Sequence, residues 1–468
     1  MKSPQPSTVV IHRQRIADTL SMLGRGLIER RREVRLLLLA ALAGEHTLLI
    51  GPPGTAKSEL ARRLHWAFRD ARYFERLLTR FSVPEELFGP LSIAALEQDR
   101  YERQTAGFLP EASIAFIDEV FKANSAILNA LLTLLNEREF DNGAGRQRCP
   151  LISVVGATNA VPEDEVADAF MDRFLLRLPV RPVSAEGFMR LLSPTNPTAP
   201  DGHAPLDEAE RRAIGAAARR VVLPDAVAAT LAALRAALEH EPCYVSDRRW
   251  VKVAWLLKVA AATDARSAVS HWDLWLLPWC LAADAERQRW VADWLVARLG
   301  VREGVGPERL TRIVEAFEAQ LQAEREANDL DYDEAGRLKL GPDLADEVGD
   351  AKGGARALRL TYTRKRRYGE CHVQARIGQI DALLERIGRY AAELHAWRDE
   401  LTALAATSLW LDEVFAADAR VRLDVLDAGL EQLTARALAA RAGFGDLPRL
   451  ARDTGWVPEP VAHEPLPL

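Results

Sequence analysis

Short apolar runs alternate with amphipathic stretches between residues 46 and 180, and this pattern predicts alternating strands and helices. Apolar runs of strand length occur at 46–50, 73–78, 114–118, 152–157 and 175–178. Strands separated by helices pair in parallel, because each connection has to cross over the sheet. The pattern therefore predicts an α/β fold, a doubly wound parallel sheet whose functional loops lie at its carboxyl edge.

Helical periodicity dominates the rest of the chain. Residues 11–43 are predicted to be helical, and so is the region from 206 to about 300, after a Pro- and Gly-rich stretch at 193–202. The last third has three series of apolar residues three or four apart, which predict a helical bundle: Leu310, Ile313, Phe317 and Leu321; Ile377, Ile380, Leu384, Ile387 and Leu394; Leu423, Leu426, Leu430 and Leu433. We predict an α/β core at 1–182, an all-α domain at 183–300, and a C-terminal bundle at 301–468 with a short insert at about 326–372.

Composition limits the classes of protein to which this chain can belong. The chain has 468 residues and a net charge of −6, which argues against a broad basic surface for nucleic acid. Its four cysteines are far apart and lack metal-ligand spacing, and no apolar run is long enough to span a bilayer, so we expect a cytoplasmic protein with reduced thiols. A basic run at 364–367 leaves two alternatives open, a solvated turn or a peripheral contact with membrane or nucleic acid.

The stretch 48–58 joins an apolar strand to a helix through a glycine-containing loop. Gly51, Lys57 and Ser58 have the spacing of a phosphate-binding loop, in which the lysine reaches the β- and γ-phosphates and the hydroxyl binds Mg²⁺. The helix that follows directs its N-terminal dipole at the phosphates. The sequence therefore predicts a site for ATP or GTP, with Mg²⁺. The residues between Gly51 and Lys57 are Pro52, Pro53, Gly54, Thr55 and Ala56, and Ala56 replaces the usual glycine.

Polar residues end two of the predicted strands. Asp118 and Glu119 follow the strand at 114–118, and Asn159 follows the strand at 152–157. At the edge of the sheet that carries the loop, Asp118 is expected to hold the Mg²⁺ shell and Glu119 to polarise the attacking water. Asn159 is expected to meet the γ-phosphate or that water.

Phosphoryl transfer also needs positive charge near the γ-phosphate, which a neighbouring subunit can supply. Arg173, just before the last core strand, is our candidate for this arginine finger, and Arg138 is the alternative. Arginines in the first turn of a helix are disfavoured by the helix dipole. One of the two arginines at 248–249 is therefore expected to pair with a negative charge on a ligand. Arg248 is our choice and Arg249 the alternative.

These residues together resemble the AAA+ ATPases, and among them the MoxR family and its regulatory-ATPase-variant (RavA-like) branch. The resemblance covers about residues 11–300 and is weaker in the C-terminal helices. It is carried by segments 51–58, 80–90, 108–112, 116–119, 131–138, 157–159 and 244–250.

The resemblance implies an AAA+ P-loop core with an all-α lid, and an ATPase with ATP and Mg²⁺ that forms a homo-oligomeric, hexameric ring. It implies that Asn159 is sensor 1, Arg173 the finger and Arg248 sensor 2, and that Leu27 and Ile28 pack on the adenine. Two inserts, 92–107 and a hairpin around 141–145, would project toward the pore or partner face.

By the same resemblance, the partner is a protein with a von Willebrand factor A domain, and the function is chaperone-like remodelling of a protein substrate. The alternatives are a nucleic-acid-associated AAA+ motor, a nucleotide-gated scaffold without turnover, and a monomeric kinase of small molecules. The insert at 326–372 is short for the extra β domain of the RavA-like branch, so the target stays open.

Overall fold

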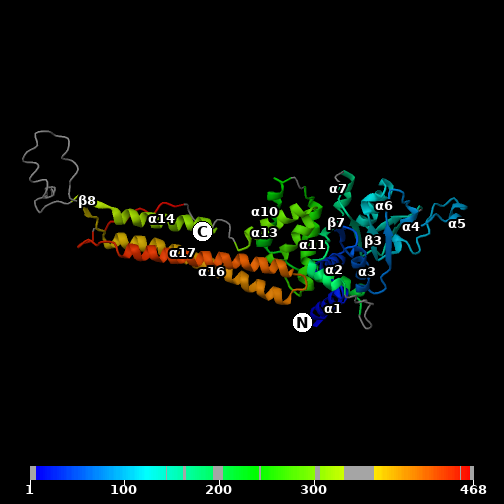
Figure 1. The fold of residues 1–468 in the computed structure, drawn as a ribbon, viewed down its shortest axis with the longest axis horizontal. Coiled ribbons are helices and arrows are strands. Elements are labelled where there is room, and N and C mark those ends of the chain that lie inside the picture. The colour runs from blue at the N-terminus through cyan, green and yellow to red at the C-terminus, as the bar shows by residue number, and fades with distance from the viewer. Residues whose placement is uncertain are drawn as a thin grey trace, which may run out of the picture. The chain divides into compact units, whose positions relative to one another are not determined.

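The computed structural model describes residues 7–143, 145–161, 165–192, 204–241, 244–300, 306–330, 363–453 and 455–463. The chain divides into two compact units. One unit holds the residues up to Val296 together with Ala403–Ala416, and the other holds Ala297–Thr402 and Ala417–Leu468. Figure 1 shows the elements of both units.

A five-stranded parallel sheet forms the centre of the first unit. Its order is β2-β3-β6-β1-β7, with neighbours in parallel register. The α/β prediction is confirmed, and each predicted strand lies within one residue of an observed one at both ends. The strands are β1 (His46–Ile50), β2 (Tyr73–Leu77), β3 (Ile114–Asp118), β6 (Ser153–Thr158) and β7 (Phe174–Pro179).

Helices α1 (Ser7–Gly24), α2 (Arg31–Ala43), α3 (Lys57–Leu64) and α6 (Ser125–Glu137) belong to this core. The predicted helix over 11–43 is wrong in one respect, because residues 25–30 interrupt it. Gly26 and Glu29 have φ of 74° and 55°, and such left-handed residues end a helix. The interruption contains Leu27 and Ile28, the residues expected at the adenine.

The helices after β7 follow the predicted all-α pattern. Trp272 and Trp275 are buried among them, as helix packing requires. These helices are α8 (Ala185–Leu191), α9 (Glu208–Arg220), α10 (Asp225–Leu238), α11 (Asp247–Thr263), α12 (Leu277–Leu281) and α13 (Ala285–Arg298). One further helix, α7 (Glu165–Met171), precedes β7. The stretch at 193–202 lies outside the described residues, and the three-domain division stays a prediction.

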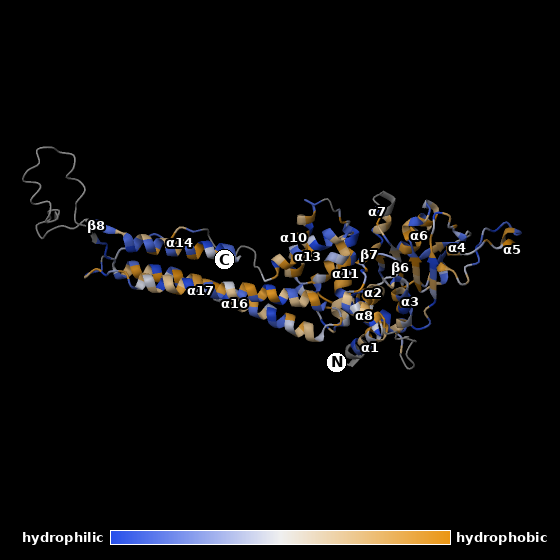
Figure 2. Cartoon of the chain, in the orientation of Figure 1, coloured by the Kyte–Doolittle hydropathy of each residue, from blue (hydrophilic) through white to orange (hydrophobic). Residues whose placement is uncertain are grey.

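Both predicted inserts are present in the core. Segment 92–107 contains α5 (Ile93–Leu96), which follows α4 (Glu85–Phe88) and projects beyond the other core elements in Figure 1. Figure 2 shows hydrophobic colour on α5, where the Ile93 side chain is 73% exposed. The other insert is the antiparallel hairpin of β4 (Glu139–Asp141) and β5 (Arg146–Arg148).

The second unit is helical, as the periodicity predicts. It contains α14 (Pro307–Glu326) and most of α16 (Glu370–Thr407) and α17 (Glu413–Gly445). The apolar series on α14 and α17 is buried. On α16, Ile377 and Leu384 of the predicted series are only half-buried, and Leu383 is buried in the place predicted for Leu384. In a helix this long, a one-residue shift of the seam follows from a small drift in helical phase.

Little of the predicted insert at 326–372 is described. Strands β8 (Asn328–Leu330) and β9 (Thr363–Lys365) pair at its base, and residues 331–362 lie outside the described residues. Within the basic run, Arg366 is bonded to Asp329 at 3.0 Å. Cys149 and Cys280 are buried free thiols, Cys371 is half-buried, and Cys243 is not described. Among the helices that are described, none combines the length and the apolar character needed to cross a membrane.

Candidate nucleotide-binding site

The loop between β1 and α3 has a backbone that side chains would obstruct. A Cβ on Gly51 would lie 2.1 Å from the carbonyl oxygen of Val180, so only glycine fits there. Gly54 and Ala56 have φ of 77° and 71°, so the loop turns through left-handed residues before α3 begins. No side chain caps the N-terminus of α3. The free amides and the dipole there suit a phosphate.

Lys57 is the first residue of α3, and its side chain folds back over the loop. Its Nζ donates to the carbonyl oxygens of Gly51 at 2.7 Å and Pro52 at 2.9 Å. Burial lowers the pKa of Lys57, and the carboxylates of Asp118 and Glu119 oppose this. The lysine is therefore held between the phosphate loop and the two acids at the end of β3.

The polar ends of β3 and β6 meet at the same edge of the sheet. Asp118 ends β3 and its Oδ1 accepts a hydrogen bond from the backbone of Glu119 at 3.0 Å. Asn159 follows β6, and its Nδ2 donates to Glu119 Oε1 at 2.5 Å. The structure thus brings together the predicted acid and the predicted amide, next to Lys57.

The same edge offers a partial set of Mg²⁺ ligands. Ser58 lies in the first turn of α3, and Asp118 is half-buried beside the loop. Within the described ranges, no group of His, Cys, Asp and Glu could hold a metal ion by itself. Mg²⁺ fits such a site, because it takes one or two protein oxygens together with phosphate oxygens and water.

Leu27 and Ile28 lie on the wall of a hollow of about 920 Å³. Arg30, two positions after Ile28, is a residue that sequence reasoning missed. Arg30 is only 6% exposed, and it donates to the carbonyl oxygens of Thr55 at 3.2 Å and Arg181 at 2.7 Å. It ties the segment before α2 to the phosphate loop. An arginine buried against backbone carbonyls has no spacing signal in a sequence.

Arg173 lies at the opposite, amino edge of the sheet. It directly precedes Phe174, which pairs with His46, the first residue of β1, whereas the phosphate loop follows Ile50, the last. Four residue steps along a strand span roughly 13 Å. Within one chain, the structure does not bring Arg173 to the loop.

Arg248 lies at the same amino edge. Its side chain is exposed and donates to Asn136 Oδ1 at 2.5 Å, at the end of α6. Its charge reaches Arg173, whose pKa is lowered by burial and then by Arg248. The positive charge needed at a γ-phosphate is therefore concentrated away from the chain's own loop.

The two alternative arginines are occupied within the chain. Arg249 is 2% exposed and donates to the carbonyl oxygens of Phe174 at 2.6 Å and Cys280 at 2.7 Å, which joins α11 to β7 and α12. Arg138 ends α6 and donates to the carbonyl oxygen of Gly44. Arg248 is therefore more accessible to a ligand than Arg249, and the choice of Arg173 over Arg138 stays a prediction.

Asp172 connects Arg173 to helix α11, a role that sequence reasoning missed. Its carboxylate accepts from Arg173 at 3.3 Å and from the hydroxyl of Ser246 at 3.3 Å. Ser246 also caps α11, the helix that carries Arg248. The finger candidate and the helix of the sensor candidate are therefore held by one carboxylate.

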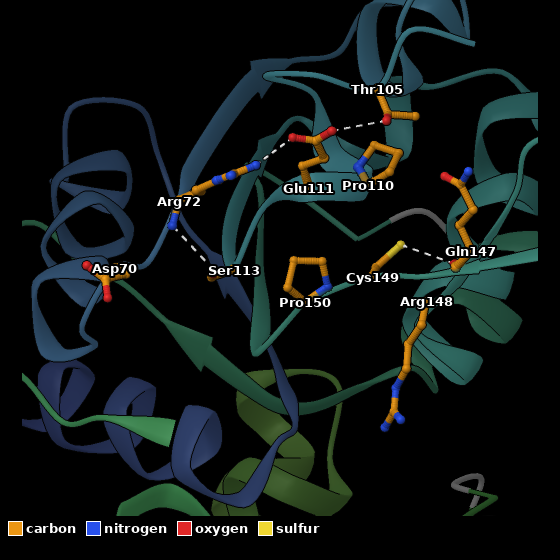
Figure 3. Close-up of a pocket in the computed structure, with 10 residues that line it drawn as sticks. All are labelled: Asp70, Arg72, Thr105, Pro110, Glu111, Ser113, Gln147, Arg148, Cys149 and Pro150. Atoms are coloured by element: carbon orange, nitrogen blue, oxygen red, sulfur yellow. Dashed lines mark hydrogen bonds and ion pairs between the residues drawn. The ribbon is translucent and has the colours of Figure 1, made fainter. Parts of the chain in front are cut away.

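A second, smaller hollow lies at the amino edge and is separate from the loop. Figure 3 shows its lining, where Arg72 and Glu111 form an ion pair at 2.5 Å and Ser113 precedes β3. Its volume is about 330 Å³. None of the predicted nucleotide residues lines it.

Comparison with known proteins agrees with this geometry. Residues 14–203 match a family model described as the MoxR domain in MoxR–von Willebrand factor A–β-propeller ternary systems, and residues 226–295 match an AAA lid domain. Through these two segments, the chain is similar to the MoxR family of AAA+ ATPases. The RavA-like branch within it stays a prediction.

Individual relatives cover only part of this chain. An uncharacterized protein of Methanocaldococcus jannaschii is 42% identical over 252 residues, 53% of this chain and 65% of the relative, so the match spans a little under two thirds of that protein. Protein MoxR of Paracoccus denitrificans is 28% identical over 172 residues, 36% of this chain and 50% of the relative. The solved structure of a candidate ATPase from Cytophaga hutchinsonii shares the fold, with a TM-score of 0.51 at 18% identity over 63% of this chain and 97% of that one.

The backbone of Ala56 leads to a first prediction. Because Ala56 has φ of 71°, a β-branched side chain there is strained, and Ala56→Val is expected to lower the free energy of unfolding by about 1 kcal/mol and weaken nucleotide binding. Ala56→Gly is the matched control, since glycine adopts this conformation freely, and its affinity should stay within a few-fold of wild type. Calorimetric titration and thermal unfolding measure both effects. Equal affinity for the valine variant would contradict the strain argument.

Proposed function

We propose that this chain is a Mg²⁺-dependent ATP hydrolase whose complete site forms between two copies of the chain in a ring. One observation carries the proposal. Lys57, Glu119 and Asn159 gather at the carboxyl edge of the sheet, while Arg173 and Arg248 lie at the amino edge of the same sheet. A second copy that presents its amino edge supplies the missing positive charge.

In this proposal each residue has a distinct task. Lys57 leaves the loop carbonyls and binds the β- and γ-phosphates, and Glu119 accepts the proton of the attacking water. Asn159 holds Glu119 and the water in position through the bond between its amide and the carboxylate. Ser58 and Asp118 would hold Mg²⁺, which neutralises phosphate charge when bound. Arg173 and Arg248 of the neighbouring copy stabilise the charge that develops on the γ-phosphate.

The energy of ATP hydrolysis is proposed to drive the remodelling, or the assisted assembly, of protein complexes. The support is the description of the matched family model, which is defined in systems with a von Willebrand factor A protein. We therefore propose a partner of that class, a hexameric ring, a chaperone-like role and a cytoplasmic setting. The RavA-like branch is supported by the long C-terminal helices, whereas the insert between α14 and α16 is short for the extra β domain of that branch.

The nucleotide site itself is tested by Lys57→Ala. Removing the ammonium takes away charge-assisted hydrogen bonds to phosphate, so the affinity for ATP should fall at least roughly 100-fold. Isothermal titration of the full chain with ATP and Mg²⁺ measures it. Lys365→Ala, an exposed lysine of the second unit, is the matched control and should bind as wild type does. Undiminished binding by Lys57→Ala would refute the assignment of the loop.

A further inference from the structure

The connection between α16 and α17 belongs to the first compact unit, although most of both helices belongs to the second. We call this connection, residues 403–416, the elbow. Trp410 of the elbow is 1% exposed, and its Nε1 donates to Thr263 Oγ1 at 2.8 Å. The hydroxyl of Ser408 and the backbone of Leu409 both donate to the carboxylate of Asp264, at 2.5 and 2.9 Å. Buried polar bonds of this kind fix one position of the elbow on α11.

A second anchor joins the elbow to α2. Asp412 accepts two hydrogen bonds from the guanidinium of Arg32, at 2.8 and 2.9 Å, which is the paired geometry that makes such bonds strong. Asp412 also caps α17 by accepting from the backbone of Phe415 at 3.1 Å. The first turn of α17 is therefore fixed to the first turn of α2.

The N-terminus of α2 also contacts the phosphate loop. Arg30 immediately precedes α2 and donates to the carbonyl oxygen of Thr55, and Arg32 is the second residue of the helix. The two arginines are two positions apart, so one helix end touches the loop on one side and the elbow on the other. The N-terminal end of α2 therefore links the phosphate loop to the elbow.

The elbow also forms part of the hollow that Leu27 and Ile28 line. The wall of this hollow of about 920 Å³ includes Leu27 and Ile28, Leu20 of α1, Met189 of α8, and Ser408 and Leu409 of the elbow. Four arginines also line it, which are Arg25, Arg31, Arg35 and Arg190. The apolar members of this wall suit a flat heterocyclic base, which gains most from apolar contact on its faces.

We propose that Leu409 and Ser408 of the elbow complete the base-binding pocket for the nucleotide, so that binding of the base is coupled to the α16–α17 pair. This inference rests on the proposed nucleotide site, and it adds residues that lie more than 200 positions beyond the MoxR match. The coupling is reciprocal. If a partner that binds and moves these helices changes the affinity for nucleotide by some factor, nucleotide changes the affinity for that partner by the same factor.

Two probes separate base recognition from phosphate recognition. A nonhydrolysable ATP analogue has the base, and inorganic tripolyphosphate has only the phosphates. Leu409→Ala removes apolar contact from the base, so the affinity of the full chain for the analogue should fall roughly tenfold, while its affinity for tripolyphosphate stays within about twofold. Val421→Ala, at an exposed position on α17, is the matched control and should change neither. Equal loss for both probes would overturn the inference.

A second variant tests the pocket without touching the elbow. An added Cβ at Gly24 meets no atom within 4 Å, and Gly24 lines the hollow, so Gly24→Leu fills it without a clash at that atom. We expect this variant to lose affinity for the analogue and to keep it for tripolyphosphate. Thermal unfolding of each variant shows whether the fold is kept, and Leu409→Met, which conserves volume, should bind the analogue almost as wild type does.

Hydrogen exchange measures the coupling in the wild-type chain. Backbone amides of 403–416 should exchange more slowly with the analogue than with tripolyphosphate. Identical exchange with both probes would overturn the coupling while leaving the nucleotide site in place. If neither probe binds the wild-type chain, the proposed function itself fails, so the two failures are distinguishable.

Discussion

Arg173→Ala subunits are expected to bind ATP as wild type does and to hydrolyse it roughly 10³–10⁵-fold more slowly, the range found for arginine fingers in other NTPases. The physical reason is the position of Arg173 at the amino edge of the sheet, away from its own phosphate loop. Its loss removes charge from a neighbour's site and leaves the chain's own loop intact. Steady-state turnover and calorimetric binding, measured on the same preparation, separate the two effects.

Mixing decides whether Arg173 acts between subunits. Arg173→Ala subunits keep Lys57, and Lys57→Ala subunits keep Arg173, so an interface that pairs the two correctly contains one complete site. Mixed rings should recover part of the activity that neither variant has alone, and turnover per wild-type chain should rise with protein concentration as rings form. Co-assembly without any recovery would show that Arg173 acts in its own subunit or that another residue, such as Arg138, is the finger.

Arg248 serves as an internal comparison in the same experiment. It shares the amino edge with Arg173, and Asp172 connects the finger to the helix that carries Arg248. Arg248→Ala subunits should therefore be complemented by Lys57→Ala subunits in the same way. Arg249 is buried in backbone contacts, so Arg249→Ala should lower the melting temperature instead.

Glu119→Gln is expected to keep ATP binding and to lose hydrolysis by roughly 10²–10⁴-fold, the usual contribution of a general base. Glutamine keeps an acceptor oxygen for the amide of Asn159 but cannot take a proton from water. Glu137→Gln is the matched control, since Glu137, the last residue of α6, pairs with Arg146 of β5 at the surface. This variant should hydrolyse ATP normally. Wild-type turnover by Glu119→Gln would exclude the proposed role.

The same variant can identify the partner. A chain that binds ATP without hydrolysing it holds its target in the ATP-bound state, so capture with Glu119→Gln and ATP should enrich the target relative to capture without nucleotide. Turnover that rises on addition of DNA would instead favour the nucleic-acid motor that the net charge of −6 argues against.

The sequence alone determined the elements that depend on local pattern. Strand positions follow from short apolar runs, and the phosphate loop follows from the spacing of Gly51, Lys57 and Ser58. Each of these signals spans only a few consecutive residues, so the local sequence is enough to reveal it. The parallel sheet then forces the ends of β3 and β6 to one edge, which is why Glu119 and Asn159 could both be placed near the nucleotide before the structure. The break at 25–30 was missed, because left-handed residues such as Glu29 carry no periodic signal.

Only the tertiary structure decided which residues far apart in sequence meet. Arg248 and Arg249 are adjacent in sequence, yet the packing of α11 on β7 buries one and exposes the other. Arg30 and Asp412 have no recognisable motif, because a buried arginine or a helix cap is defined by the carbonyls and amides around it. The return of the elbow to α2, across some 380 positions, depends on long-range packing that no local pattern encodes.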